Sequence, residues 1–228
     1  MELIALPIYN QATITPRRIA ELYTYVQGVN DVLIVDDGSD DGIGDLIKTG
    51  EKLKYIRHES PLGYGGSFIT VMEYAFKHDF ERVYFLDISN ENFTEPVVLM
   101  REILDSGADI VNISRKQMKQ KTDDYLIINP SEPVSQKINS VTGFCLNDVF
   151  SPFKGFAINS LKEMTLEEFD ESLILQLWIQ SAHYKKKVRE VYCSKILDGT
   201  INDISILSHD PEYYLNFIQG ELLLYPQN

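Results

Sequence analysis

Residues 31–42 read DVLIVDDGSDDG, and this stretch decides how the chain folds. The run Val32–Val35 is apolar and mostly β-branched, it lies between turn formers, and it predicts a buried parallel strand. Two carboxylates, Asp36 and Asp37, follow at once. Ligands of open α/β sheets bind just past the carboxyl ends of the strands, where carboxylates can accept hydrogen bonds from a base or a ribose. A binding crevice is one interpretation, and a turn in which an aspartate caps the next helix is the other.

The composition describes a soluble globular protein. Of the 228 residues 44% are hydrophobic and 24% are charged, which is enough for a substantial core. The net charge of -13 argues against a surface for nucleic acid or for an anionic membrane. Cys145 and Cys193 lack metal-ligand spacing, which favours reduced thiols in a cytoplasmic protein. No apolar run reaches the length of about 18 residues that a membrane-spanning helix needs, so we expect no integral membrane segment.

Strand and helix patterns alternate on both sides of the opening stretch. Strands are expected at 2–8, 32–35, 53–57, 82–86 and 109–113, with helical patterns in between, which predicts an α/β fold: a mostly parallel sheet with helices on both faces. Polar residues follow four of these strands, namely Tyr9-Asn10, Asp36-Asp37, Asp87 and Arg115. Because parallel strands end at the same edge, we expect one shared crevice there.

The second half of the chain is less regular. Its expected elements are a polar loop or lid at 116–135, a helix at 136–146, an irregular segment at 147–155, an apolar helix at 169–183, a strand at 187–193 and a helix at 211–224. No linker separates these elements from the first half. The sequence therefore predicts a single domain over residues 1–228.

Six motifs occur along the chain in a characteristic order: LPIYN (6–10), VDDGSDDG (35–42), HESPLGYGGSFITVMEYA (58–75), VYFLDISNEN (83–92), DIVNISRK (109–116) and DVFSPFKGF (148–156). The set resembles the family-2-type inverting glycosyltransferases, and within them the polyprenol-phosphate sugar synthases of the dolichol-phosphate mannose synthase type. The resemblance implies a GT-A-like, Rossmann-like fold. It also implies a nucleotide-sugar-binding half at 1–115 and an acceptor half at 116–228.

The resemblance implies particular roles on the donor side. In such enzymes the PxYN segment and the VDD aspartates hold the nucleoside. The implied nucleotide-sugar-binding set of this chain comprises Pro7, Tyr9, Asp36, Asp37, Gly65, Asp87, Arg115 and Lys154.

A divalent cation is the cofactor that the resemblance implies, because a DxD motif follows the fourth strand in these enzymes. Here the motif is Asp87-Ile88-Ser89, and a serine hydroxyl is a weaker ligand than a carboxylate for a hard cation. Glu91 can supply the second carboxylate, so Mg²⁺ or Mn²⁺ is expected at Asp87 and Glu91. Asp148 occupies the position of an aspartate near the acceptor and is the candidate general base.

Two functions of different classes follow from these motifs. The first is a hexosyltransferase type of glycosyltransferase, which moves a sugar with inversion from a nucleotide-sugar donor to a lipid phosphate, a glycan or a protein. The second is a non-catalytic sugar-nucleotide-binding or partner-binding homologue that has lost its metal site, as Ser89 and Gln11, which replaces a usual glutamate, suggest. An NAD-linked enzyme is disfavoured because the glycines at 63–66 lack the full dinucleotide fingerprint. The sequence is compatible with a homo-oligomer and does not decide the oligomeric state.

Overall fold

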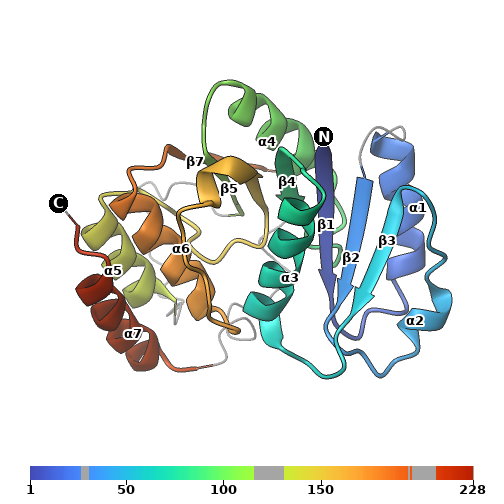
Figure 1. Ribbon diagram of the computed structural model, residues 1–228, viewed down its shortest axis with the longest axis horizontal. Coiled ribbons are helices and arrows are strands. Elements are labelled where there is room, and N and C mark those ends of the chain that lie inside the picture. The colour runs from blue at the N-terminus through green and yellow to red at the C-terminus, as the bar shows by residue number, and fades with distance from the viewer. Residues whose placement is uncertain (27–30, 116–130, 195, 197–208, 228) are drawn as a thin grey trace.

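The fold is organised around one seven-stranded sheet with the order β3-β2-β1-β4-β6-β5-β7 (Figure 1). The computed structural model describes residues 1–26, 31–115, 131–194, 196 and 209–227. The strands are β1 (Glu2–Ile8), β2 (Asp31–Asp36), β3 (Leu53–Arg57), β4 (Arg82–Phe85), β5 (Ile110–Ser114), β6 (Lys154–Ala157) and β7 (Val188–Tyr192). Among the strands of the described residues only β6 runs antiparallel to its neighbours, so the predicted mostly parallel sheet is confirmed.

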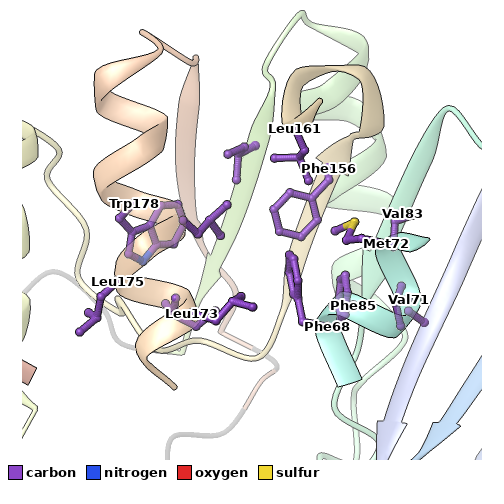
Figure 2. Close-up of a cluster of buried hydrophobic side chains, with 14 of the residues drawn as sticks. Phe68, Val71, Met72, Val83, Phe85, Phe156, Leu161, Leu173, Leu175 and Trp178 are labelled. Carbon is purple, nitrogen blue, oxygen red and sulfur yellow. The ribbon is translucent and has the colours of Figure 1, made fainter. Parts of the chain in front are cut away.

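Helices cover both faces of the sheet, as the sequence predicts. They are α1 (Thr15–Val26), α2 (Ile43–Leu46), α3 (Gly63–Lys77), α4 (Glu95–Asp105), α5 (Glu132–Thr142), α6 (Ser172–His183) and α7 (Pro211–Leu224), with a 3-10 turn at Ile158–Leu161. Leu3 and Ala5 of β1 pack into a core with α3, α5, α6 and α7, part of which Figure 2 shows. The alternate residues Ile4 and Leu6 pack on the other face with α1, α2 and α4. This alternation explains why the central strands are apolar throughout.

The strand β6 corrects one expectation from the sequence. The segment 147–155 was expected to be irregular, yet Lys154 and Gly155 belong to a strand that pairs with β4 on one side and β5 on the other. The strand has only four residues and takes its pairing from two distant segments, so no local pattern marks it.

Two helices in the second half also differ from the sequence prediction. The helix expected at 136–146 runs from Glu132 to Thr142, so it begins and ends four residues earlier than expected, and residues 132–135 of the predicted loop are helical. The helix expected from 169 begins at Ser172. Most of the predicted lid, residues 116–130, lies outside the described residues. No helix within the described ranges is long and apolar enough to cross a membrane.

Candidate donor-binding edge

The strand order reverses between β1 and β4. The chain adds β2 and β3 on one side of β1 and then places β4 on the other side. Loops that leave the carboxyl edge on either side of such a point diverge and leave room for a ligand. The pairing of β1 with β4 ends where the Leu86 amide donates to the Ala5 carbonyl oxygen at 3.0 Å. The residues that follow, Tyr9 and Asp87, therefore leave the sheet at this edge.

Pro7 lies at the position where β1 and β4 separate. In β1 the carbonyl of Ala5 faces β4, whereas the carbonyl of Ile8 accepts a hydrogen bond from the β2 side. Backbone groups of neighbouring residues in a strand point to opposite sides, so those of Pro7 point toward β4. They lie beyond the last residue of β4 that pairs with β1. Proline has no N–H group, and this is tolerated here because no hydrogen bond between strands would form at this position. Tyr9 follows with 51% of its surface exposed, available to a planar ligand.

The loops after β1 and β2 are tied together by hydrogen bonds. The amide of Asn10 donates to Ser39 Oγ at 2.9 Å, and the amide of Asp40 donates to Asn10 Oδ1 at 2.9 Å. Asn10 adopts a left-handed backbone conformation with φ 51°, which asparagine tolerates better than most residues. This edge is therefore held in shape before any ligand binds.

Asp36 is completely buried, with a relative exposure of 0%. Its Oδ1 accepts from the Ser39 amide at 2.9 Å, while its Oδ2 accepts from the Tyr55 hydroxyl and lies 3.6 Å from Arg57 Nε. Burial and this hydrogen bond to Asp36 raise the pKa of Tyr55, so the phenol stays a donor. In this arrangement Asp36 shapes the turn, and Arg57, with 52% of its side chain exposed, is the most exposed group of this cluster.

Asp37 caps the start of α3. Its Oδ1 accepts from the Leu62 amide and its Oδ2 from the Gly63 amide, both at 2.8 Å. His58 Nδ1 lies 2.7 Å from Asp37 Oδ1, and His58 Nε2 lies 2.9 Å from Thr70 Oγ1. A carboxylate here satisfies amides that have no partner within the helix and complements the positive end of the helix dipole. Asp37 is thus a capping aspartate, but the helix that it caps is α3 and not α2, the next helix along the chain. The predicted contact of Asp36 and Asp37 with a nucleoside stays a prediction.

Gly65 lies beneath a segment from the second half of the chain. The glycines at 63–66 form the first turn of α3, and the Gly66 amide donates to the Phe169 carbonyl oxygen at 3.1 Å. A Cβ on Gly65 would lie 2.2 Å from the carbonyl oxygen of Glu168. Glycine is thus required for the backbone of residues 168–170 to pack on α3. The predicted contact of Gly65 with a nucleotide sugar stays a prediction.

Asp87 lies at the strand-order reversal and is partly exposed. Its Oδ1 accepts from both the amide and the hydroxyl of Ser89, at 2.9 and 2.6 Å. Glu91 is exposed on the following turn, where its carbonyl oxygen lies 3.5 Å from Arg18 Nη1. Among the described residues no three His, Cys, Asp or Glu side chains are grouped closely enough to hold a metal ion. The donor set still suits a hard cation held by one or two carboxylates, phosphate oxygens and water.

Arg115 and Asp148 form a buried ion pair. Arg115 Nε donates to Asp148 Oδ2 at 2.7 Å, Nη2 donates to Oδ1 at 2.9 Å, and the Arg115 amide also donates to Oδ2 at 3.1 Å. Glu190 Oε1 accepts from the Asp148 amide at 3.1 Å and from Asn112 Nδ2 at 2.8 Å. Both Asp148 oxygens are therefore occupied by Arg115. The role of Asp148 as a general base stays a prediction, and it requires this pair to open.

Lys154 is fully buried beside this pair. Its Nζ donates to the Ser151 carbonyl oxygen and lies 5.5 Å from the centre of the Trp178 ring. Burial lowers the pKa of Lys154 to about 7, although the charge of Asp148 acts in the opposite direction. The side chain of Lys154 lies in the interior against Trp178 of α6. Its contact with a nucleotide sugar, which the resemblance implies, stays a prediction.

Sequence reasoning missed several residues of this edge, among them Tyr55, Arg57, His58, Asn112 and Glu190. Each acts through a partner that is distant in sequence. His58 opens the motif at 58–75, but no local pattern shows that its side chain contacts Asp37. Only strand pairing brings Glu190 of β7 to Asn112 of β5, whose Cα atoms are register partners.

Comparison with known proteins gives one family and one fold. The model of glycosyl transferase family 2 matches residues 3–150. The polyprenol monophosphomannose synthase of Mycolicibacterium smegmatis is 23% identical over 118 residues, which cover 50% of this chain and 44% of that protein. The chain thus matches less than half the length of this curated relative.

Solved structures share the fold at low sequence identity. The glucosyl-3-phosphoglycerate synthase of Mycobacterium tuberculosis in complex with UDP superposes with a TM-score of 0.72 at 14% identity, over 97% of this chain and 79% of that one. The same enzyme with Mn²⁺, UDP-glucose and phosphoglyceric acid gives 0.72 at 13% identity, with the same coverage. The mannosyl-3-phosphoglycerate synthase of Rubrobacter xylanophilus gives 0.69 at 11% identity, over 97% of this chain and 74% of that one.

Proposed function

The chain belongs to glycosyl transferase family 2, and on this premise we propose that it is a nucleotide-sugar-dependent glycosyltransferase that inverts the anomeric centre of the sugar. The match of the family model to residues 3–150 carries the proposal. This stretch contains β1 to β5 and all the parallel strand ends around the strand-order reversal, from Tyr9 to Arg115. The acceptor is a hydroxyl or phosphate group of a lipid, a glycan or a protein.

The donor binds at the edge formed by Tyr9 and Asp87. Tyr9 offers an exposed aromatic ring to the nucleoside, and Pro7 fixes the strand end from which it projects. Asp36 and Asp37 act by holding this edge in shape, with Arg57 as the exposed charge beside them. A rigid edge of this kind lowers the entropic cost of binding.

A divalent cation, Mg²⁺ or Mn²⁺, fits this edge. Asp87 and Glu91 are the residues of this chain that would hold it. Bound there, the cation would neutralise the negative charge of the diphosphate leaving group. The neighbouring Ser89 hydroxyl, which donates to Asp87, fixes the rotamer of that carboxylate.

The transfer itself is an in-line displacement. The acceptor oxygen forms a bond to the anomeric carbon, the bond to the diphosphate oxygen breaks, and the acceptor proton leaves to a base. Asp148 is the proposed base on the acceptor side once Arg115 releases it. An acceptor phosphate is already anionic and would need no such base, in which case Asp148 only positions Arg115.

The experiment is a thermal-shift and calorimetric screen of UDP, GDP, UDP-glucose and GDP-mannose, each with and without Mn²⁺. Saturation at about 100 times the dissociation constant stabilises a protein by ~2.7 kcal/mol, which is easily detected. We expect at least one nucleotide sugar to bind more tightly with Mn²⁺, and Asp87→Asn to remove that dependence. The control is Asp105→Asn, a carboxylate near the end of α4 that bonds Arg82.

Two outcomes of this screen would distinguish an active enzyme from a non-catalytic homologue. Binding that does not depend on Mn²⁺, without transfer or hydrolysis of any nucleotide sugar, would favour a non-catalytic homologue. In that case Ser89→Asp is expected to create the metal dependence, because two carboxylates would then hold the cation. Absence of binding by all four ligands would refute the proposed function.

A further inference from the structure

Tyr64 lies on the first turn of α3, on the side that covers β4. One helical turn further on, the ring of Phe68 stacks on that of Phe85 with the centroids 4.7 Å apart (Figure 2). The helix runs antiparallel to β4 (Figure 1). Tyr64 lies four residues before Phe68 on the helix, and Asp87 lies two residues after Phe85 on the strand. Because the two elements run in opposite directions, Tyr64 and Asp87 lie on the same side of the ring pair. Tyr64 is thus positioned at the donor-binding edge.

The Tyr64 hydroxyl is a buried donor without a partner. Its oxygen is shielded from solvent, and within the described part of the chain it makes no hydrogen bond. Burial, together with the negative charges of Asp87 and Glu171, raises the pKa of Tyr64, so the group stays protonated. Buried polar groups of native proteins are nearly always paired, and an unpaired one needs an explanation. A ligand group bound at this edge would provide one.

The surrounding charge selects the kind of ligand group. The backbone of residues 168–170 packs on the first turn of α3, where the Gly66 amide donates to the Phe169 carbonyl oxygen, and this brings Glu171 at the start of α6 near Tyr64. Asp87 approaches the hydroxyl from the end of β4. A phosphate oxygen would also accept from Tyr64, but Glu171, whose charge the proposed cation does not neutralise, would repel it. A sugar hydroxyl accepts from the phenol and can donate its own proton to a carboxylate. Glu171 already accepts from the Tyr214 hydroxyl at 3.1 Å, and a carboxylate has room for further donors.

We propose that Tyr64 donates a hydrogen bond to a hydroxyl group of the transferred sugar, with Glu171 as the acceptor for that hydroxyl, and that Tyr64 thereby contributes to sugar specificity. The inference rests on the proposed function. The proposed hydrogen bond is made to the sugar alone, so the nucleoside and diphosphate groups are expected to bind without it. Binding of the donor should therefore depend on the phenol, while binding of the free nucleoside diphosphate should not.

The test is Tyr64→Phe, which removes only the hydroxyl. We expect isothermal titration in Mn²⁺ to show binding of UDP-glucose or GDP-mannose, whichever binds the wild type, weakened about threefold to tenfold, as for loss of one hydrogen bond. Binding of UDP or GDP should be unchanged. Tyr74→Phe, on the same helix near its other end, is the matched control and should leave all four affinities unchanged.

A stability measurement separates this role from a structural one. Since the hydroxyl has no partner among the described residues, Tyr64→Phe should be as stable as the wild type in urea or more stable. A loss of stability would reveal a structural partner and overturn the inference. An equal loss of affinity for nucleotide sugar and nucleoside diphosphate, or no loss for either, would also overturn it while leaving the proposed function intact. A wild type that binds no nucleotide sugar refutes both proposals.

Discussion

Replacing Asp37 by alanine should destabilise the fold, because this carboxylate caps α3 from the end of β2. The two amides that it accepts from, Leu62 and Gly63, precede or open the helix and have no helical partner. The side chain of His58 also loses its partner on Oδ1. The substitution thus removes the hydrogen bonds by which a single side chain connects the end of β2 to α3 and to the end of β3.

The size of the effect follows from these contacts. A hydrogen bond to a charged group contributes about 1.5–3 kcal/mol. Leu62 and Gly63 are partly exposed, so water can replace part of the loss, and the lower end of the range applies to each amide. We expect a loss of ~3 kcal/mol in the free energy of unfolding. For a chain of this size that corresponds to a decrease of about 6–12 °C in Tm.

Urea denaturation of the wild type, Asp37→Ala and Asp37→Asn measures this loss. Asparagine keeps one acceptor oxygen and should recover part of the stability. Asp40→Ala is the control, since the Asp40 side chain is exposed and, within the described part of the chain, only its amide is bonded, to Asn10. A change below about 0.5 kcal/mol in Asp37→Ala, together with lost nucleotide binding, would refute the capping role and favour direct contact with the ligand.

Three further predictions concern stability. Lys154→Met should stabilise the protein near pH 7, because burial lowers the pKa of Lys154 from 10.5 to about 7. Between these two pH values the folded state binds fewer protons than the unfolded state, so the stability of the wild type rises with pH. Urea midpoints from pH 7 to 10 should show that rise in the wild type and in Lys77→Met but not in Lys154→Met. Glu2→Gln should lessen the acid sensitivity of unfolding between pH 7 and 3. Burial raises the pKa of Glu2, but hydrogen bonds from Arg101 and Tyr84 outweigh it and lower the pKa below 4.5, so the stability that Glu2 contributes is present above that pH and lost as the pH falls. Gly65→Ala should cost about 1–3 kcal/mol in the same assay because its Cβ would meet the Glu168 carbonyl, whereas Gly50→Ala, with open space around it, should change little.

The sequence alone determined the elements whose signals are local. The apolar run at 32–35 with its turn formers became β2, and the helix expected at 211–224 became α7, where Asp210 accepts from the Tyr213 amide at 2.9 Å. The strand ends that carry Tyr9, Asp36 and Asp87 were also predictable, because polar residues directly follow apolar runs. These features depend on interactions among a few neighbouring residues, so the sequence alone is enough to predict them.

The tertiary structure alone decided what those residues contact. The same carboxylate of Asp37 could face a ribose or cap a helix, and only the position of α3 shows that it accepts from Leu62 and Gly63. The four-residue β6 exists because β4 and β5 leave a gap that it fills, and this strand carries Lys154 into the interior. Hydrogen bonds, burial and charge depend on distances between segments far apart in sequence, and a linear pattern does not contain those distances.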